Sequence, residues 1–298
     1  MKKIYTQLHL HSSYSLSDST INIDRLIKAA KKNKLKSLAI TDRLNMFAAI
    51  KFYQKCIDNK IKPIIGCEIP LKSSASNKLE GTIIALCQNY SGYKNLIKLL
   101  SEIHVGKKAN ENPAVIKSQL EKYNQGIILL TGGRKGLLGE NLLVDNLQDK
   151  NLLLKSLKDI FPDRLYLQID RINANNEEIY NNKIINLAED LNLPLVATNN
   201  VLFLEKQDFD AHEVRVCINK KIKIDDRTNQ TEFTDHQFFK SEKEMISMFE
   251  DLPDAIQNIS EIIKRCNIHI SSDSYHLPKF STPDNSDIDV YFDQKVRL

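Results

Sequence analysis

The sequence predicts an α/β fold built on a parallel β-sheet. Short, almost continuously apolar runs recur along the first two thirds of the 298 residues, and amphipathic segments lie between them. Such runs are typical of parallel strands that are buried on both faces. Alternating strands and helices favour a sheet covered by helices, either an open doubly wound sheet or a closed barrel, and the pattern alone does not choose between these two.

Seven segments have the length and composition of strands: Ile4–Leu10, Leu35–Thr41, Ile61–Ile69, Thr82–Cys87, Gly126–Thr131, Arg164–Ile169 and Leu195–Thr198. Between them, apolar residues recur at helical spacing, for example at Ile23, Leu26, Ile27 and Ala30. Each such face predicts a helix that covers the sheet. The glycine-rich phosphate-binding motifs GxGxxG and GxxxxGK[ST] are absent, which weakens a nucleotide-binding interpretation.

The character of the sequence changes near Phe203, and we expect three regions. Residues 1–205 form the α/β core, residues 206–270 form a helical remainder, and residues 271–298 form a linker and the start of a further helix that looks cut off. Within the second region, Ser241 and Glu244 predict a capping box at the start of a helix pair that is broken near Pro253.

Composition limits the classes of protein. The net charge of +4 is too small to argue for nucleic-acid binding by itself. The five cysteines are scattered and form no CxxC pair, which argues against a disulfide framework or a zinc knuckle and fits a reducing cytosol. No apolar run reaches membrane-spanning length, and the first residues lack the apolar region of a secretory signal.

One group of residues has the composition of a metal site. His9 and His11 stand two apart, so an extended backbone aims both imidazoles to one face. Asp18 follows, Asp42 closes the second predicted strand, and Glu68 closes the third. Two imidazoles and three carboxylates at one barrel mouth would suit zinc, manganese or iron acting on phosphate esters. Alternatively, the histidines are ordinary polar residues and the acids only cap helices.

Several segments in order resemble a known family: HLHSSYSLSD at 9–18, LAITDRLNMFAAIKFYQKC at 38–56, LVATNN at 195–200 and YHLPKF at 275–280. They are similar to the PHP domain that opens the alpha subunit of bacterial DNA polymerase III. The resemblance covers essentially the whole chain. It implies an α/β fold with a distorted seven-stranded βα barrel and a C-terminal helical extension.

Metal-bearing members of that family hold a multinuclear centre and hydrolyse phosphoesters. By resemblance, this sequence keeps four ligand positions, at His9, His11, Asp18 and Glu68, although Ser19 replaces the usual glycine. The other positions have changed, to Arg43, Thr82, Gly133, Asn200 and Leu202. A guanidinium is permanently charged and cannot ligate a cation.

We therefore expect the metal centre to be eroded, with no catalytic residue and no cofactor in this domain. Arg43 would then pair with Asp18, Asp42 or Glu68. The alternative is one Zn, Mn or Mg ion held by His9 and His11.

The resemblance implies a structural or docking domain of a DNA-directed DNA polymerase, a nucleotidyltransferase of DNA replication in the cytoplasm. Its expected partners are the rest of the alpha chain, the proofreading exonuclease subunit and, through the holoenzyme, DNA; no membrane is expected. One alternative is an active metal-dependent PHP phosphoesterase or a proofreading 3′–5′ exonuclease. Another is a truncated gene product without an independent role.

Overall fold

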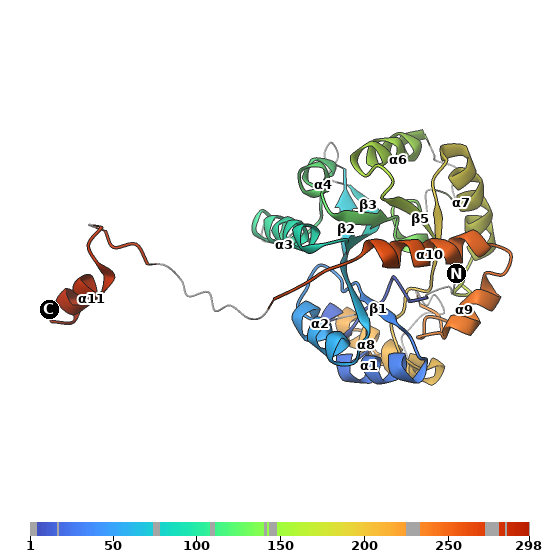
Figure 1. Ribbon diagram of the computed structural model, residues 1–298. Coiled ribbons are helices and arrows are strands. Elements are labelled where there is room, and N and C mark those ends of the chain that lie inside the picture. Colours follow the sequence, from blue (N-terminus) through green and yellow to red (C-terminus); the bar gives the residue numbers. More distant parts are fainter. Residues whose placement is uncertain are drawn as a thin grey trace. The chain divides into compact units, whose positions relative to one another are not determined.

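The computed structural model describes residues 5–16, 18–73, 78–107, 111–139, 142, 148–224, 233–271, 280–283 and 285–297. The chain divides into two compact units, Met1–Ile268 and His269–Leu298. The first unit contains the sheet (Figure 1). In the second, helix α11 (Ile288–Val296) begins at Asp287, whose carboxylate accepts the backbone N–H of Asp289. Among the described residues, no helix has the length and apolar character needed to cross a membrane.

A curled sheet of six strands forms the centre of the first unit. The strands are β1 (Ser37–Ile40), β2 (Lys62–Lys72), β3 (Leu79–Cys87), β4 (Ile127–Leu130), β5 (Leu165–Asp170) and β6 (Leu195–Thr198), and they lie side by side in sequence order. The predicted all-parallel arrangement is wrong at one strand, because β3 runs antiparallel to both β2 and β4. The connection from β2 to β3 is too short for the crossover that a parallel pair requires.

The first predicted strand, Ile4–Leu10, is also not confirmed as a regular strand. Within its described part, Leu10 alone forms a bridge, to Val201, and its carbonyl accepts the N–H of Thr41 at 2.8 Å. Both partners lie just past the ends of β1 and β6, so the segment meets its neighbours where their regular pairing has stopped. The described sheet therefore has six strands where the sequence predicted seven.

Helices surround the outside of the sheet (Figure 1). They are α1 (Ile23–Lys32), α2 (Ala49–Asp58), α3 (Tyr90–Val105), α4 (Lys117–Tyr123), α6 (Gln148–Ile160), α7 (Glu177–Leu191), α8 (Phe209–Lys220), α9 (Glu242–Met248) and α10 (Pro253–Arg265). Short 3-10 turns occur at Ser13–Ser15, Gly133–Lys135 and Lys206–Asp208. Helix α2 packs on β2, α3 on β3, α7 on β5 and α10 on β6.

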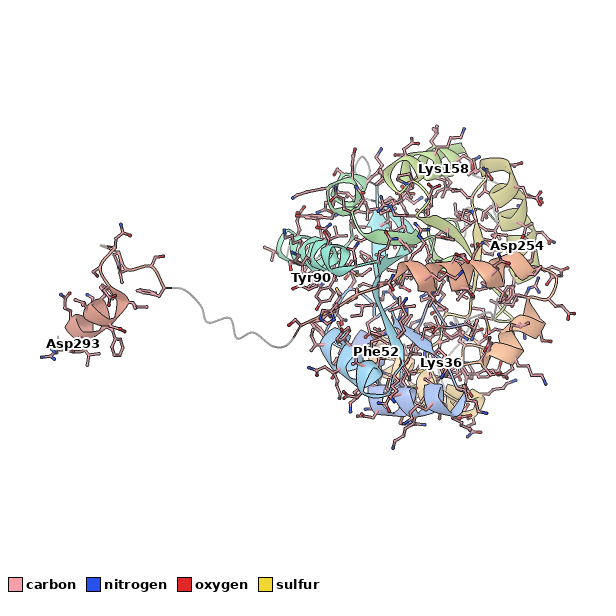
Figure 2. All side chains as sticks on the ribbon, in the orientation of Figure 1. Lys36, Phe52, Tyr90, Lys158, Asp254 and Asp293 are labelled. Carbon is pink, nitrogen blue, oxygen red and sulfur yellow. The ribbon has the colours of Figure 1, made fainter. Side chains whose placement is uncertain are left out.

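The predicted helix signals have their expected structural roles. The apolar face of α1, with Leu26 and Ala30, is fully buried. The capping box of α9 is confirmed, since Glu244 N–H donates to Ser241 Oγ at 3.3 Å and Ser241 N–H donates to Glu244 Oε2 at 2.7 Å. Apolar side chains form the core, among them the fully buried Phe52 of α2, which is labelled in Figure 2.

Candidate metal centre

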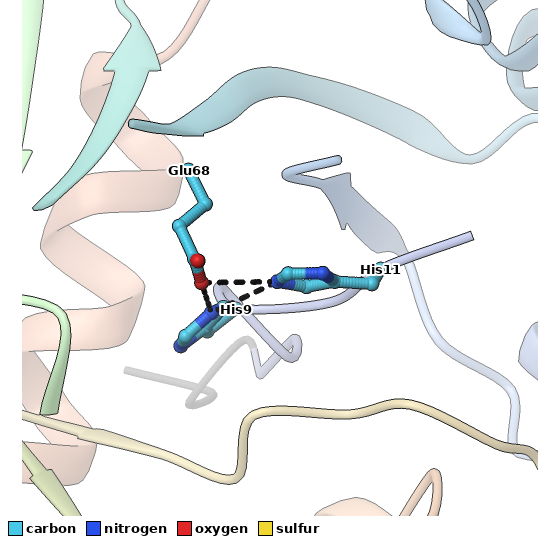
Figure 3. Close-up of side chains that lie close together, drawn as sticks. All are labelled: His9, His11 and Glu68. Carbon is cyan, nitrogen blue, oxygen red and sulfur yellow. Dashed lines mark hydrogen bonds and ion pairs between the residues drawn. The ribbon is translucent and has the colours of Figure 1, made fainter. Parts of the chain in front are cut away.

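Three buried side chains converge beside the sheet: His9, His11 and Glu68 (Figure 3). Glu68 Oε2 lies 2.9 Å from His9 Nε2 and 3.2 Å from His11 Nε2. The two Nε2 atoms lie 3.1 Å from each other. One ligand atom from each residue lies within 4.8 Å of the other two. Three nitrogen and oxygen donors thus face a common point.

The backbone around Leu10 holds the two imidazoles in place. Val201 N–H donates to the carbonyl of His9 at 2.9 Å, and His11 N–H donates to the carbonyl of Val201 at 3.0 Å. This extended stretch sends residues 9 and 11 to the same side, as their spacing predicted. Glu68 lies inside β2, opposite Ile84 of β3, and not at the end of its strand as the sequence predicted. The strand continues past Glu68 because β3 pairs with its second half.

The short distances between Glu68 and the two histidines shift the pKa values of Glu68 and His11. Burial acts to lower the pKa of His11, but the charge and hydrogen bond of Glu68 outweigh it and raise that pKa above its usual value. Burial acts in the opposite direction on Glu68, where the charge and hydrogen bond of His11 and the contacts of His9 hold the pKa well below its usual range. The carboxylate is therefore stabilised as an anion by the two imidazoles.

Arg43 brings a further positive charge to the same carboxylate. Its Nε lies 3.7 Å from Glu68 Oε1, and its Nη1 lies 3.1 Å from Asp18 Oδ2. The backbones of Arg43 and Glu68 also form an isolated bridge. Two of the three acids named as partners for Arg43 thus lie within ion-pair distance of it.

Asp42 serves the loop that follows His11. Its Oδ1 accepts the N–H of Ser12 at 2.6 Å and the hydroxyl of Ser15 at 2.7 Å, and its Oδ2 accepts the hydroxyl of Ser12 at 2.7 Å. The side chain is 2% exposed. In the structure, Asp42 therefore fixes the backbone and hydroxyls of the neighbouring loop.

Comparison with known families assigns this chain to a family. The family model described as "PHP domain" matches residues 7–172, which include His9, His11 and Glu68. The chain belongs to the PHP domain family. The DNA polymerase III subunit alpha of Pseudomonas fluorescens is 36% identical over 292 residues, 98% of this chain and 25% of that protein. The same subunit of Escherichia coli K12 is 36% identical over 282 residues, 95% of this chain and 24% of that protein.

The PHP chain therefore spans about a quarter of the length of these curated relatives. Among solved structures, an amidohydrolase from Chromobacterium violaceum is similar with a TM-score of 0.44 and 12% identity, covering 66% of this chain and 87% of that chain. That likeness is too low to support a conclusion about function.

The other positions that the sequence analysis compared with ligand positions of the family lie in different surroundings. Gly133 has a φ of +67°, and a Cβ added there would stand 1.8 Å from Asp170 Oδ2. Thr82 donates its hydroxyl to the carbonyl of Lys135 at 3.3 Å. Asn200 has a φ of +43°. Leu202 is 1% exposed and contributes an aliphatic side chain without a donor atom.

Ser19, the residue after Asp18, has a structural role. Its hydroxyl oxygen lies 2.7 Å from the carbonyl of His11 and 2.8 Å from the carbonyl of Leu202. It thus joins the loop after His11 to the segment after β6.

Sequence reasoning missed two polar residues of β5. Gln168 is fully buried, and its Nε2 lies 3.0 Å from Nδ1 of His9. Asp170 is 4% exposed and accepts hydrogen bonds from Gln168 and Thr198. The available signal was two polar residues at alternate positions of an otherwise apolar strand, which places both on one face. Glutamine is not a usual metal ligand, so its residue type did not predict a position beside His9.

The converging donors fit one divalent cation. Two imidazoles and a carboxylate are ligands that zinc and manganese accept, and His9, His11 and Glu68 would hold the ion. Such an ion would act as a Lewis acid when bound. A cluster of several ions fits less well. Two of the positions expected to hold further ligands carry the guanidinium of Arg43 and the aliphatic side chain of Leu202, and neither can ligate a cation.

Proposed function

We propose that this chain is the PHP domain of a replicative DNA polymerase III alpha subunit and that it serves as a structural and docking domain with an eroded metal centre. The assignment to the polymerase is supported by relatives of that name, which match 95% to 98% of the chain. The observation that carries the loss of catalysis is the guanidinium of Arg43, 3.7 Å from Glu68 Oε1.

Electrostatic repulsion opposes the binding of a metal ion beside Arg43. A permanent cation and a divalent ion a few ångströms apart repel each other by several kcal/mol, on the order of what an effective dielectric near 20 gives. Arg43 also competes with the ion for the oxygens of Glu68 and Asp18. By resemblance, the metal-bearing members of the family hold several ions, so an arginine at a ligand position removes one donor and adds a positive charge beside the acids that attract metal.

Two finer features belong to the same proposal. The segment around Leu10 takes the place of a seventh strand and completes a distorted barrel between β1 and β6; its backbone bonds to Thr41 and Val201 support this. The domain acts in the cytoplasm, joined to the rest of the alpha chain, and docks the proofreading exonuclease subunit, meeting DNA through the holoenzyme.

The second candidate function is a metal-dependent phosphoesterase or 3′–5′ exonuclease. It is favoured by the convergence of His9, His11 and Glu68 on one point. A multinuclear centre of the kind that the resemblance implies would need further ligands at positions where the chain has Arg43 and Leu202.

Metal analysis of the purified chain separates the two functions. We expect at most one equivalent of zinc or manganese after equilibration and dialysis, and no hydrolysis of single-stranded DNA or of p-nitrophenyl phosphate. Three bound equivalents together with turnover would establish the phosphoesterase. Docking is tested by gel filtration of the chain with the exonuclease subunit of the same organism, and separate elution of the two would refute that role.

A further inference from the structure

The side-chain nitrogen of Gln168 contacts two other residues, His9 and Asp170. Its Nε2 lies 3.0 Å from His9 Nδ1 and 3.2 Å from Asp170 Oδ1. Its Oε1 is buried and has no hydrogen-bond partner among the described residues. An amide nitrogen carries two hydrogens and no acceptor site. The Gln168 amide thus has one N–H available for His9 and one for Asp170.

Asp170 determines which way this amide faces. A carboxylate oxygen only accepts hydrogen bonds, so the group next to it must donate. Thr198 donates its hydroxyl to the same Oδ1. Rotating the Gln168 amide by half a turn would set its carbonyl oxygen against the Asp170 carboxylate, two acceptors in contact in a fully buried place. That contact is strongly unfavourable in a low-dielectric interior.

The orientation of the amide decides where His9 carries its proton. If Gln168 donates to Nδ1, then Nδ1 holds the lone pair and the proton of the neutral imidazole is on Nε2. The Nε2–H then faces Glu68 Oε2, an acceptor 2.9 Å away, with His11 Nε2 beside it at 3.1 Å. A histidine that ligates metal through Nε2 has the opposite arrangement, with Nδ1–H donated to an acceptor behind it.

We propose that Asp170 and Gln168 are positioning residues that hold His9 in its Nε2–H tautomer and so withdraw the Nε2 lone pair from a metal ion. The inference rests on the proposed function and extends it, because it gives a second cause, besides Arg43, for the loss of the metal centre. It involves residues of β5 that lie behind His9, on the side away from Glu68.

The tautomer is measured directly by long-range ¹H–¹⁵N NMR of the metal-free wild-type chain at neutral pH, with the His9 signals assigned from a His9→Gln variant. We expect a pyrrole-type, protonated Nε2 and a pyridine-type Nδ1. A protonated Nδ1, alone or together with Nε2, would overturn the inference. This result does not depend on how many ions the wild type binds, so it fails independently of the proposed function.

The combined change Gln168→Glu and Asp170→Asn tests the consequence for metal. It places an acceptor against Nδ1 and removes the neighbouring charge that fixed the amide. We expect His9 to become Nδ1–H and the Zn²⁺ affinity, measured by competition with a chelating dye, to rise by roughly 10- to 100-fold, the usual size of such effects. The matched control, Gln168→Met with Asp170→Asn, has no acceptor and should show no such rise.

A variant whose tautomer changes without a gain in affinity would show that the proton on Nε2 is not what excludes the ion. An equal gain in the control would also contradict the inference, because the lost Asp170 charge would then be the cause. If neither variant folds, the spectrum of the wild type still decides the tautomer.

Discussion

Arg43 Nη1 lies 3.1 Å from Asp18 Oδ2, so an ion pair joins the loop after β1 to the loop that leads into α1. The same guanidinium reaches Glu68 Oε1 at 3.7 Å. An arginine thus lies between two acids that resemble metal ligands of the family. The guanidinium places a positive charge beside both carboxylates.

Restoring the family residues should restore metal affinity. The triple change Arg43→His, Asn200→Asp and Leu202→His removes the guanidinium and adds three donors near His9. We expect tighter binding of zinc and manganese than in the parent chain, measured by isothermal titration calorimetry. Arg171→His is the control, since Arg171 pairs with Asp251 elsewhere. A triple variant that binds no more metal than the parent would show that the ancestral pocket is misplaced.

Asp42 should be needed for stability in the absence of metal. Asp42→Ala leaves the N–H and hydroxyl of Ser12 and the hydroxyl of Ser15 without their acceptor. We expect a loss of about 3 kcal/mol or more in the free energy of unfolding, measured by urea denaturation in EDTA. Asp251→Ala, at an exposed ion pair, should cost about 1 kcal/mol or less. Equal losses in the two variants would argue against the role given to Asp42.

Gly133 should not tolerate a side chain. Its φ of +67° and the 1.8 Å approach of Asp170 Oδ2 to an added Cβ both oppose Gly133→Ala. The backbone conformation alone costs about 1–3 kcal/mol, and the steric contact adds to it. Thermal unfolding would measure the loss. Gly106→Ala is the control, because its φ is −77° and its nearest contact is 2.9 Å.

A second change at residue 133's neighbour separates these two costs. In the Gly133→Ala, Asp170→Ala chain the closest contact is removed, while the backbone cost and a 2.8 Å contact with Gln168 Nε2 remain. Gly133→Ala should therefore cost less in the Asp170→Ala background than in the wild type. A cost that is unchanged between the two backgrounds would refute the contact.

The buried His212 should make stability depend on pH. Burial lowers its pKa to about 4 from the ordinary 6.5. Between these values the unfolded chain binds more protons, so stability from this group is complete above pH 6.5 and is lost as the pH falls toward 4, by up to about 3 kcal/mol. Urea unfolding from pH 7.5 to 4.5 should show a shallower decline for His212→Gln than for wild type. Parallel curves would contradict the prediction.

The sequence was sufficient for features that depend on local spacing. The buried face of α1, the capping box of α9 and the shared side of His9 and His11 all follow from residues that are near each other in the chain. The reversed direction of β3 was not predicted, because apolar runs do not encode strand direction. The sequence also could not show that Ile4–Leu10 pairs at Leu10 only within its described part, because that pairing depends on where β1 and β6 stop.

The remaining part of the site depends on contacts between distant segments. Gln168 lies 159 positions from His9, and neither its charge nor its type signals a role beside a metal ligand. The partners of Arg43 could be named only as three alternatives, because distances to Asp18 and Glu68 come from how the loops fold. Local patterns thus gave the donors, and the tertiary structure gave the groups that act on them.

The three hydrogen bonds that end on Asp42 bear on how such domains are recognised from sequence. An acid with these hydrogen bonds would be needed for folding whether or not the domain binds metal. The threonine–aspartate pair at 41–42 would then remain in the sequences of related domains that hydrolyse nothing. A genome survey that infers nuclease activity from that pair alone would count such domains as enzymes. The residue that follows the pair, Arg43 in this chain, would distinguish them better.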